Sequence, residues 1–296
     1  MEGAEEMISC TCILAGIDLG AETEKIVSYA ACFSSAVKAP VRLLYVMDYL
    51  LTPPSYLMPY VEEERKRGEA EMARLQSVLR KTGVPSDFRL MMGRLHESFV
   101  TAITEYKPDL LILGYASHAF RPSSSERLIR SLQMPMLVVR GKRSEGAAAG
   151  PAAIRKILCA VDFSENSRKA LEKAAAYASA FSASLHVVHA VPYHRLKERW
   201  SQWNTDIKKD MERFESTVDG EVREALSRMI SDAGIAAHGE LMHGAPSDVI
   251  CTAAESGAYD LVVMGARGLS YIKGMLIGSV TETVIKTSPC PVLIVH

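Results

Sequence analysis

The chain lacks the features that mark membrane, secreted and nucleic-acid-binding proteins. Its 296 residues carry a formal net charge of −1, whereas general nucleic-acid binders are usually basic. Its apolar runs are short, far below the roughly 18–20 residues that cross a bilayer. Residues 1–9 include acidic but no basic residues, so we expect no secretory signal. We therefore expect a cytoplasmic protein that contacts neither membrane nor nucleic acid.

The six cysteines form no recognisable metal or redox pattern. Cys10 and Cys12 make a C-x-C pair, and no second pair completes a zinc set. Four of the cysteines lie in or beside apolar patterns, where reduced cysteine behaves as a small hydrophobe. His186 and His189 are three positions apart in a predicted strand, so they face opposite sides and cannot share a metal. We expect no metal ligands among the side chains.

The chain contains an internal repeat. Three segments recur in the same order, with later copies shifted by 144, 151 and 156 positions. These pairs are residues 13–18 (ILAGID) with 157–162 (ILCAVD), 109–114 (DLLILG) with 260–265 (DLVVMG), and 134–139 (MPMLVV) with 290–295 (CPVLIV). The copies are therefore collinear, with small insertions in the second.

A stretch of small residues at 141–151 separates the copies and is typical of a linker. A chain of this length can bury two ordinary cores. We predict two domains, residues 1–141 and 153–296.

Within each copy, short Val, Ile and Leu runs alternate with helical patterns. Strands that are apolar almost throughout indicate a parallel sheet with helices on both faces. We predict two tandem α/β domains, each with an open five-stranded parallel sheet in strand order 3-2-1-4-5. Ligands bind such sheets at the carboxyl ends of the strands, where the order reverses. In the second copy the strands are predicted at residues 155–162, 184–191, 236–242, 260–265 and 291–295, with the longest helix near 200–233.

Glycines surround the loop that follows the predicted fourth strand of the second copy. Gly265 and Gly268 lie at the end of that strand, and Gly278-Ser279 begins the next helical pattern. Glycines let backbone N–H groups approach an oxyanion, and a helix N-terminus attracts it. The spacing matches neither the P-loop nor the dinucleotide fingerprint. An ordinary strand-to-helix loop is the alternative, but the position beside Asp162, at the expected crevice, favours a nucleotide site.

With its motifs taken together, the chain resembles a tandem universal stress protein. In the second copy these motifs are KILCAVDFS at 156–164, Gly265-x-x-Gly268-x9-Gly278-Ser279, and PCPVLIV at 289–295. The glycine pattern is similar to that of the ATP-binding branch of the family. The resemblance covers nearly the whole chain and implies an adenine nucleotide alpha hydrolase-like fold. It also implies that ATP or AMP is the ligand, with any Mg²⁺ held by the phosphates.

The resemblance assigns roles by position. Gly265 and Gly268 would shape the loop over ribose and phosphates, and Asp162 would lie on the adenosine side. Gly278, Ser279 and Thr281 would hold phosphate oxygens through N–H and hydroxyl groups, and the backbone near Leu185 to Val187 would meet the adenine edge. Arg267 and Lys273 would either neutralise phosphate charge or lie in solvent. The expected binding residues are Ala160, Asp162, Leu185, Val187, Met264, Gly265, Arg267, Gly268, Gly278, Ser279, Val280 and Thr281.

The first copy departs from this pattern. Ser117 replaces the second glycine, Pro122-Ser123 stands in place of Gly278-Ser279, and the loop is five residues shorter. Proline lacks an N–H donor. We therefore expect the first domain to have lost phosphate binding.

Three functions remain open for the chain. The first is an adenine-nucleotide-binding regulator in the stress response, in which occupancy modulates contact with an unknown protein partner. The second is a slow ATPase or phosphotransferase, although no general base and no Walker-type lysine is visible; we expect at most weak hydrolysis and assign no catalytic residue. The third is a structural module that binds no nucleotide.

The resemblance also implies an intramolecular pseudo-dimer. The last strand of each copy, Met136–Arg140 and Val292–His296, should end its sheet, and an apolar edge favours pairing with another strand. The short linker holds the copies together at an effective concentration of roughly millimolar. We expect these strands to pair within one chain, and a homodimer of chains is a further possibility.

Overall fold

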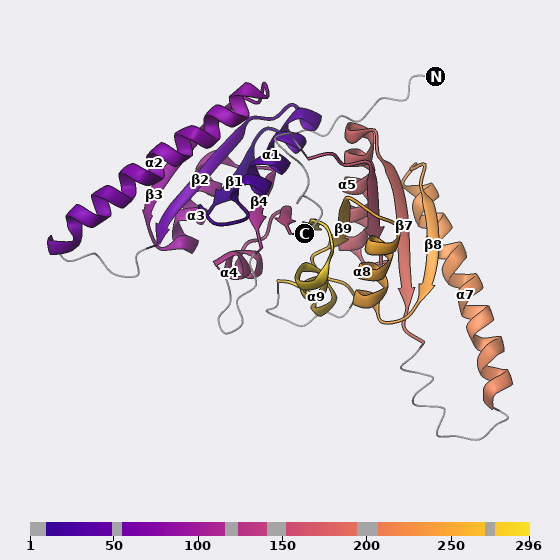
Figure 1. The fold of residues 1–296 in the computed structure, drawn as a ribbon. Coiled ribbons are helices and arrows are strands. Elements are labelled where there is room, and N and C mark those ends of the chain that lie inside the picture. Colours follow the sequence, from indigo (N-terminus) through magenta and orange to yellow (C-terminus); the bar gives the residue numbers. More distant parts are fainter. Residues whose placement is uncertain (1–9, 49–54, 116–123, 141–151, 194–206, 270–275) are drawn as a thin grey trace. The chain divides into compact units, whose positions relative to one another are not determined.

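The computed structural model describes residues 10–48, 55–115, 124–140, 152–193, 207–269 and 276–296. The chain divides into two compact units, Met1–Ala153 and Ile154–His296. Each unit is an α/β domain, and each is described by itself. Their elements can be followed by label in Figure 1.

The first domain alternates strands and helices along the chain. Its elements are β1 (Ile13–Ile17), α1 (Thr23–Val37), β2 (Val41–Asp48), the 3-10 helix η1 (Ser55–Leu57), α2 (Met58–Lys81), β3 (Ser86–Gly93), α3 (Leu95–Tyr106), β4 (Leu110–Gly114), α4 (Ser124–Ser131) and β5 (Met136–Val139). The strands pair in the order β3-β2-β1-β4-β5, and every pair is parallel.

The second domain repeats this arrangement. Its elements are β6 (Lys156–Ala160), α5 (Glu165–Phe181), β7 (Ser184–Val191), α7 (Ile207–Asp232), β8 (His238–His243), α8 (Pro246–Ser256), β9 (Leu261–Gly265), α9 (Ser279–Thr287) and β10 (Val292–Val295). The strands pair in parallel in the order β8-β7-β6-β9-β10. Renumbered within the domain, this is 3-2-1-4-5, so the predicted fold class and strand order are confirmed in both domains.

The central strands form the core because they are apolar on both faces. Every residue of β1, β4 and β9 is buried. In the second domain, α5 packs on β6 and β9, α7 on β8, and α8 on β7. Burial on both faces explains why the strands read as continuous Val, Ile and Leu runs. The five strands predicted for this domain end within two residues of those observed.

Strand β7 extends beyond its neighbour β6. Ala160, the last residue of β6, lies level with Val188, three residues before β7 ends. The Val161 N–H still donates to the Val188 carbonyl at 3.0 Å. The strand order of this domain reverses between β6 and β9, and a ligand is expected beyond the carboxyl ends of the strands at that point.

Two further expectations concern the chain as a whole. Within the described ranges, no helix is both long and apolar enough to cross a bilayer. Pairing between the final strands of the two domains stays a prediction.

Candidate functional site

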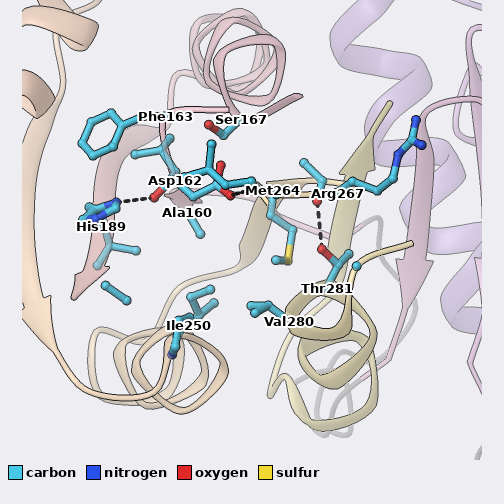
Figure 2. Close-up of a pocket in the computed structure, with 18 of the residues that line it drawn as sticks. Ala160, Asp162, Phe163, Ser167, His189, Ile250, Met264, Arg267, Val280 and Thr281 are labelled. Carbon is cyan, nitrogen blue, oxygen red and sulfur yellow. Dashed lines mark hydrogen bonds between the residues drawn. The ribbon is translucent and has the colours of Figure 1, made fainter. Parts of the chain in front are cut away.

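A cavity of about 590 Å³ opens at the carboxyl ends of β6, β7 and β9 (Figure 2). This volume falls in the range of small-molecule sites, about 300–1,000 Å³. The lining comes from the β6–α5 turn, the end of β7, helices α7 and α8, and the start of α9. It includes ten of the twelve predicted residues: Ala160, Asp162, Met264, Gly265, Arg267, Gly268, Gly278, Ser279, Val280 and Thr281.

Helix α9 begins at the cavity with an uncapped N-terminus. Its N-cap is Gly278, and no side chain caps it in the described part of the domain. The Gly278 N–H donates to the Ala266 carbonyl at 2.8 Å, which holds the helix start beside the end of β9. The first N–H groups of a helix have no partner within it. Ser279 and Val280 carry such groups and line the cavity.

Gly278 is not required by the local backbone. Its φ of −77° and ψ of 155° suit any residue. A Cβ atom there would lie 3.6 Å from the Ala266 oxygen and from the Arg267 Cα, which is ordinary contact. The missing side chain therefore leaves space on the cavity side rather than relieving strain.

The other two loop glycines allow close contact with neighbouring atoms of the protein rather than with a ligand. A Cβ on Gly265 would lie 3.0 Å from the backbone carbon of Asn166, so this glycine lets β9 approach α5 closely. A Cβ on Gly268 would lie 2.1 Å from Oδ2 of Asp162, so this glycine makes room for that carboxylate.

The Asp162 carboxylate joins two loops. Its Oδ1 accepts from the N–H of Ser164 at 3.1 Å and from the Ser164 hydroxyl. Its Oδ2 accepts from the N–H of Leu269 at 2.9 Å. The Ser164 hydroxyl also caps α5 by accepting from the N–H of Ser167 at 3.2 Å. Asp162 thus links the β6–α5 turn to the β9–α9 loop.

His189 lines the cavity, although it was not among the predicted site residues. Its Nδ1 lies 2.8 Å from the Val161 carbonyl oxygen. Burial lowers the pKa of His189 below its ordinary value, opposed by that hydrogen bond and by nearby Asp162. The Phe163 ring lies 4.6 Å from the His189 ring. The signal that could have identified this residue was its place at the carboxyl end of β7.

The expected adenine contact near Leu185 and Val187 stays a prediction, and the strand register bears on where it would lie. Both residues are buried in β7, and neither is part of the cavity lining. Because Ala160 lies level with Val188, the carboxyl end of β6 meets β7 beyond both of them. The lining residues of this strand are Val188, His189 and Ala190.

The structure shows how two further predicted side chains, those of Thr281 and Arg267, lie. Thr281 is 3% exposed. Its hydroxyl donates a hydrogen bond to the Gly265 carbonyl at 2.9 Å, so in this structure the hydroxyl proton is not directed at a phosphate. The Arg267 side chain extends away from the cavity (Figure 2). Lys273 lies outside the described residues, as do Ser117, Pro122 and Ser123 of the first domain.

A second polar cluster borders the cavity near Pro192 and Val222, which line it. The Tyr193 hydroxyl donates to Asp219 at 3.0 Å, and Nε2 of His243 lies 2.9 Å from Oδ2 of the same carboxylate. Burial, reinforced by Asp219, raises the pKa of Tyr193 to about 12. The cluster fastens α7 to the ends of β7 and β8. Across the described residues, no group of three or more His, Cys, Asp or Glu could hold a metal ion.

The equivalent region of the first domain is filled by side chains. Gly16 precedes Asp18 by two positions, as Ala160 precedes Asp162, and Phe99 and Ile250 are each the fifth residue of their helix. A Cβ on Gly16 would lie 2.7 Å from both the Phe99 ring and the Leu113 side chain. Asp18 accepts from the N–H of Gly20 at 2.8 Å.

Comparison with known proteins agrees with the repeat. The family model described as "Universal stress protein family" matches residues 11–140 and 153–296. Universal stress protein MJ0577 of Methanocaldococcus jannaschii is 29% identical over 152 residues, covering 48% of this chain and 94% of that protein. Universal stress protein Slr1230 of Synechocystis is 23% identical over 298 residues, covering 90% and 92%. The crystal structure of a universal stress protein from Archaeoglobus fulgidus shares the fold, with a TM-score of 0.68, 20% identity and 96% coverage of both chains.

Proposed function

This chain belongs to the universal stress protein family, and from that premise we propose that its second domain binds one adenine nucleotide. The observation that carries the proposal is the uncapped start of α9 at the cavity. The N–H groups of Ser279 and Val280, with the positive end of the helix dipole, suit phosphate oxygens. Gly278 leaves the approach to them open.

The base would lie against the end of β7. The Val188 carbonyl accepts from Val161, on the β6 side, whereas the Val191 carbonyl accepts from Gly244, on the β8 side. Backbone groups alternate in direction along a strand, so the N–H and C=O of Ala190 point toward the β6 side, beyond the end of β6. A donor beside an acceptor complements N1 and the amino group of adenine. Ile250 and Met264 supply apolar lining for the ring.

The nucleotide we propose is ATP or AMP, with Mg²⁺, when present, held by the phosphates. Nucleotide occupancy would modulate contact with a protein partner in a cytoplasmic stress response. Regulation is favoured over catalysis by where the two acid–base side chains described in the lining lie. Asp162 already accepts hydrogen bonds from two loops. His189 lies beside Ala190, away from Val280 and Thr281 at the start of α9, where the phosphates would bind (Figure 2). A general base must instead reach the reacting proton.

Slow ATP hydrolysis or phosphoryl transfer is the second candidate, because the same cradle would position a γ-phosphate. The third candidate, a module that binds no nucleotide, fits the filled first domain but not the open cavity of the second. We also propose that the final strands of the two domains pair within the chain.

Two measurements test the proposal. Mass spectrometry of the natively purified protein should detect a co-purifying adenine nucleotide, and titration calorimetry should give about one site per chain. Two comparable sites would contradict the assignment to the second domain, and the absence of any adenine-nucleotide binding would leave the structural module. A phosphate-release assay separates the first two candidates, because turnover near the typical enzyme value of roughly 10 per second would establish catalysis.

A further inference from the structure

The tautomer of His189 follows from its contact with the backbone. A carbonyl oxygen can only accept a hydrogen bond, so the 2.8 Å contact from Nδ1 to Val161 places the hydrogen on Nδ1. Burial lowers the pKa of the ring, which is therefore neutral at pH 7. In a neutral imidazole with Nδ1 protonated, Nε2 is an acceptor.

The orientation of the ring is also restrained. Phe163 has a φ of 65°, a left-handed conformation that is rare for a bulky residue. This bend brings the Phe163 ring to 4.6 Å from that of His189, at an interplanar angle of 36°. Figure 2 shows the two rings beside each other, with His189 bonded toward the β6–α5 turn. In the described part of the chain Nε2 has no hydrogen-bond partner, and its residue lines the cavity.

We propose that Nε2 of His189 accepts a hydrogen bond from an N–H or O–H group of the bound nucleoside and thereby selects the ligand. This inference rests on the proposed function of the second domain. The neighbouring residue, Ala190, carries the backbone groups assigned to the base, so His189 stands at the nucleoside end of the cavity. The donor is either the exocyclic amino group of adenine or the 2′-hydroxyl of the ribose. A carbonyl at the amino position, as in hypoxanthine, would instead set two lone pairs against each other.

Two substitutions separate the two nitrogens of the ring. In His189→Asn, the amide nitrogen takes the place of Nδ1 and can still donate to the Val161 carbonyl, while the acceptor at Nε2 is lost. In His189→Gln, the side-chain oxygen reaches the place of Nε2 and restores the acceptor, while the bond to Val161 is lost. If His189 has a purely structural role, His189→Asn should disturb nucleotide binding less than His189→Gln. If His189 selects the ligand, His189→Gln should preserve the discrimination between nucleotides better than His189→Asn.

Calorimetry would compare AMP with purine riboside 5′-monophosphate, which lacks the amino group, and with 2′-deoxy-AMP. One hydrogen bond corresponds to roughly a fivefold change in affinity. We expect the native protein to bind one of the two analogues more weakly than AMP, and this penalty to shrink about fivefold in His189→Asn. It should remain in His189→Gln. If the affinity penalty shrinks for purine riboside monophosphate, the amino group is the donor. If it shrinks for 2′-deoxy-AMP, the ribose 2′-hydroxyl is the donor.

If His189→Asn keeps the native penalties for both analogues, the inference is overturned. Circular dichroism shows whether each variant is folded. If His189→Gln does not fold, the result for His189→Asn decides the question by itself. Failure of the proposed function looks different, because the native protein would then bind neither AMP nor ATP.

Discussion

In the second domain Ala160 and Ile250 both line a cavity, whereas in the first domain Gly16 and Phe99 hold the equivalent positions and meet each other. The Phe99 ring lies so close to Gly16 that a single added carbon would approach it to 2.7 Å. Phe99 is 3% exposed. The same strand order thus supports an open crevice in one domain and a packed one in the other.

Under the proposed function, this difference means that the first domain departs from the second at both ends of the site. Its sequence differs at the phosphate end, in Ser117 and Pro122-Ser123, and Phe99 packs on Gly16 at the end where a base would lie. Asp18 has a role in the turn after β1, because it accepts from the N–H of Gly20. An aspartate at the end of a first strand is therefore no sign of a ligand by itself.

The largest expected effect breaks the packed crevice. Phe99→Ala should lower the free energy of unfolding of the first domain by about 3–5 kcal/mol, because a buried ring leaves a void. Ile250→Ala should destabilise the second domain by about 2 kcal/mol, the low end for this substitution, because Ile250 already borders a cavity. Urea unfolding followed by circular dichroism measures both. A larger loss for Ile250→Ala would contradict the comparison.

The next effect concerns the open crevice alone. Gly278→Val should weaken nucleotide binding at least about hundredfold, because its side chain blocks two hydrogen bonds to a charged phosphate, each worth about 1.5 kcal/mol or more. The domain should lose no more than about 1 kcal/mol of stability, because valine is a poorer N-cap than glycine but the backbone there suits it. Calorimetry and thermal unfolding give the two readouts. Ser117→Ala in the first domain is the control and should leave binding unchanged.

A smaller effect tests the link made by Asp162. Gly268→Ala places a carbon 2.1 Å from Oδ2 of Asp162, so the carboxylate must leave the N–H of Leu269. We expect nucleotide affinity to fall roughly tenfold, because the loop after β9 is no longer tied to the β6–α5 turn, and both border the cavity. Gly20→Ala is the matched control, since its Cβ would lie 3.1 Å from Asp18, in the domain that we expect to have lost phosphate binding. Equal affinities for both variants would rule out this role.

The pairing of the two domains is tested at Ile294. Val295 accepts from the N–H of Ala266, directly after β9, so by alternation the N–H of Ile294 points away from β9. Ile294→Pro removes this donor and should speed proteolytic cleavage of the linker about fivefold, the effect of one hydrogen bond. Leu293→Pro removes a donor that faces β9 instead and should unfold the second domain. Linker cleavage at the native rate in Ile294→Pro would argue against pairing.

The smallest effect depends on pH. Burial lowers the pKa of His189 in the folded state, so the unfolded chain binds the proton more readily. The contribution of His189 to the stability of the second domain should be complete at a pH above about 6.5, the pKa of histidine in the unfolded chain. It should decline as the pH falls below that value. Tyr45 holds this position in the first domain, and burial raises its pKa, so it contributes nothing in acid. His189→Asn should remove this share of the pH dependence in urea unfolding.

Much of this molecule was predictable from its residues because the signals were local or repeated. Apolar runs marked the strands, and Gly278-Ser279 marked the helix start at the cavity. The residues of β7 that border the cavity could not be predicted, because they depend on which residue of β7 lies level with Ala160, and no local pattern sets that register. The contact of Phe99 with Gly16 joins residues far apart in the chain, so only the folded domain shows it.

The uncapped start of α9 has a consequence for the life of the protein in a cell. A bound phosphate would supply the cap that no described side chain provides. A ligand present at 100 times its Kd stabilises a fold by about 2.7 kcal/mol. Under the proposed function, the second domain would resist unfolding and degradation when adenine nucleotides are plentiful and would become fragile when energy runs low. The first domain, filled by its own phenylalanine, would not respond.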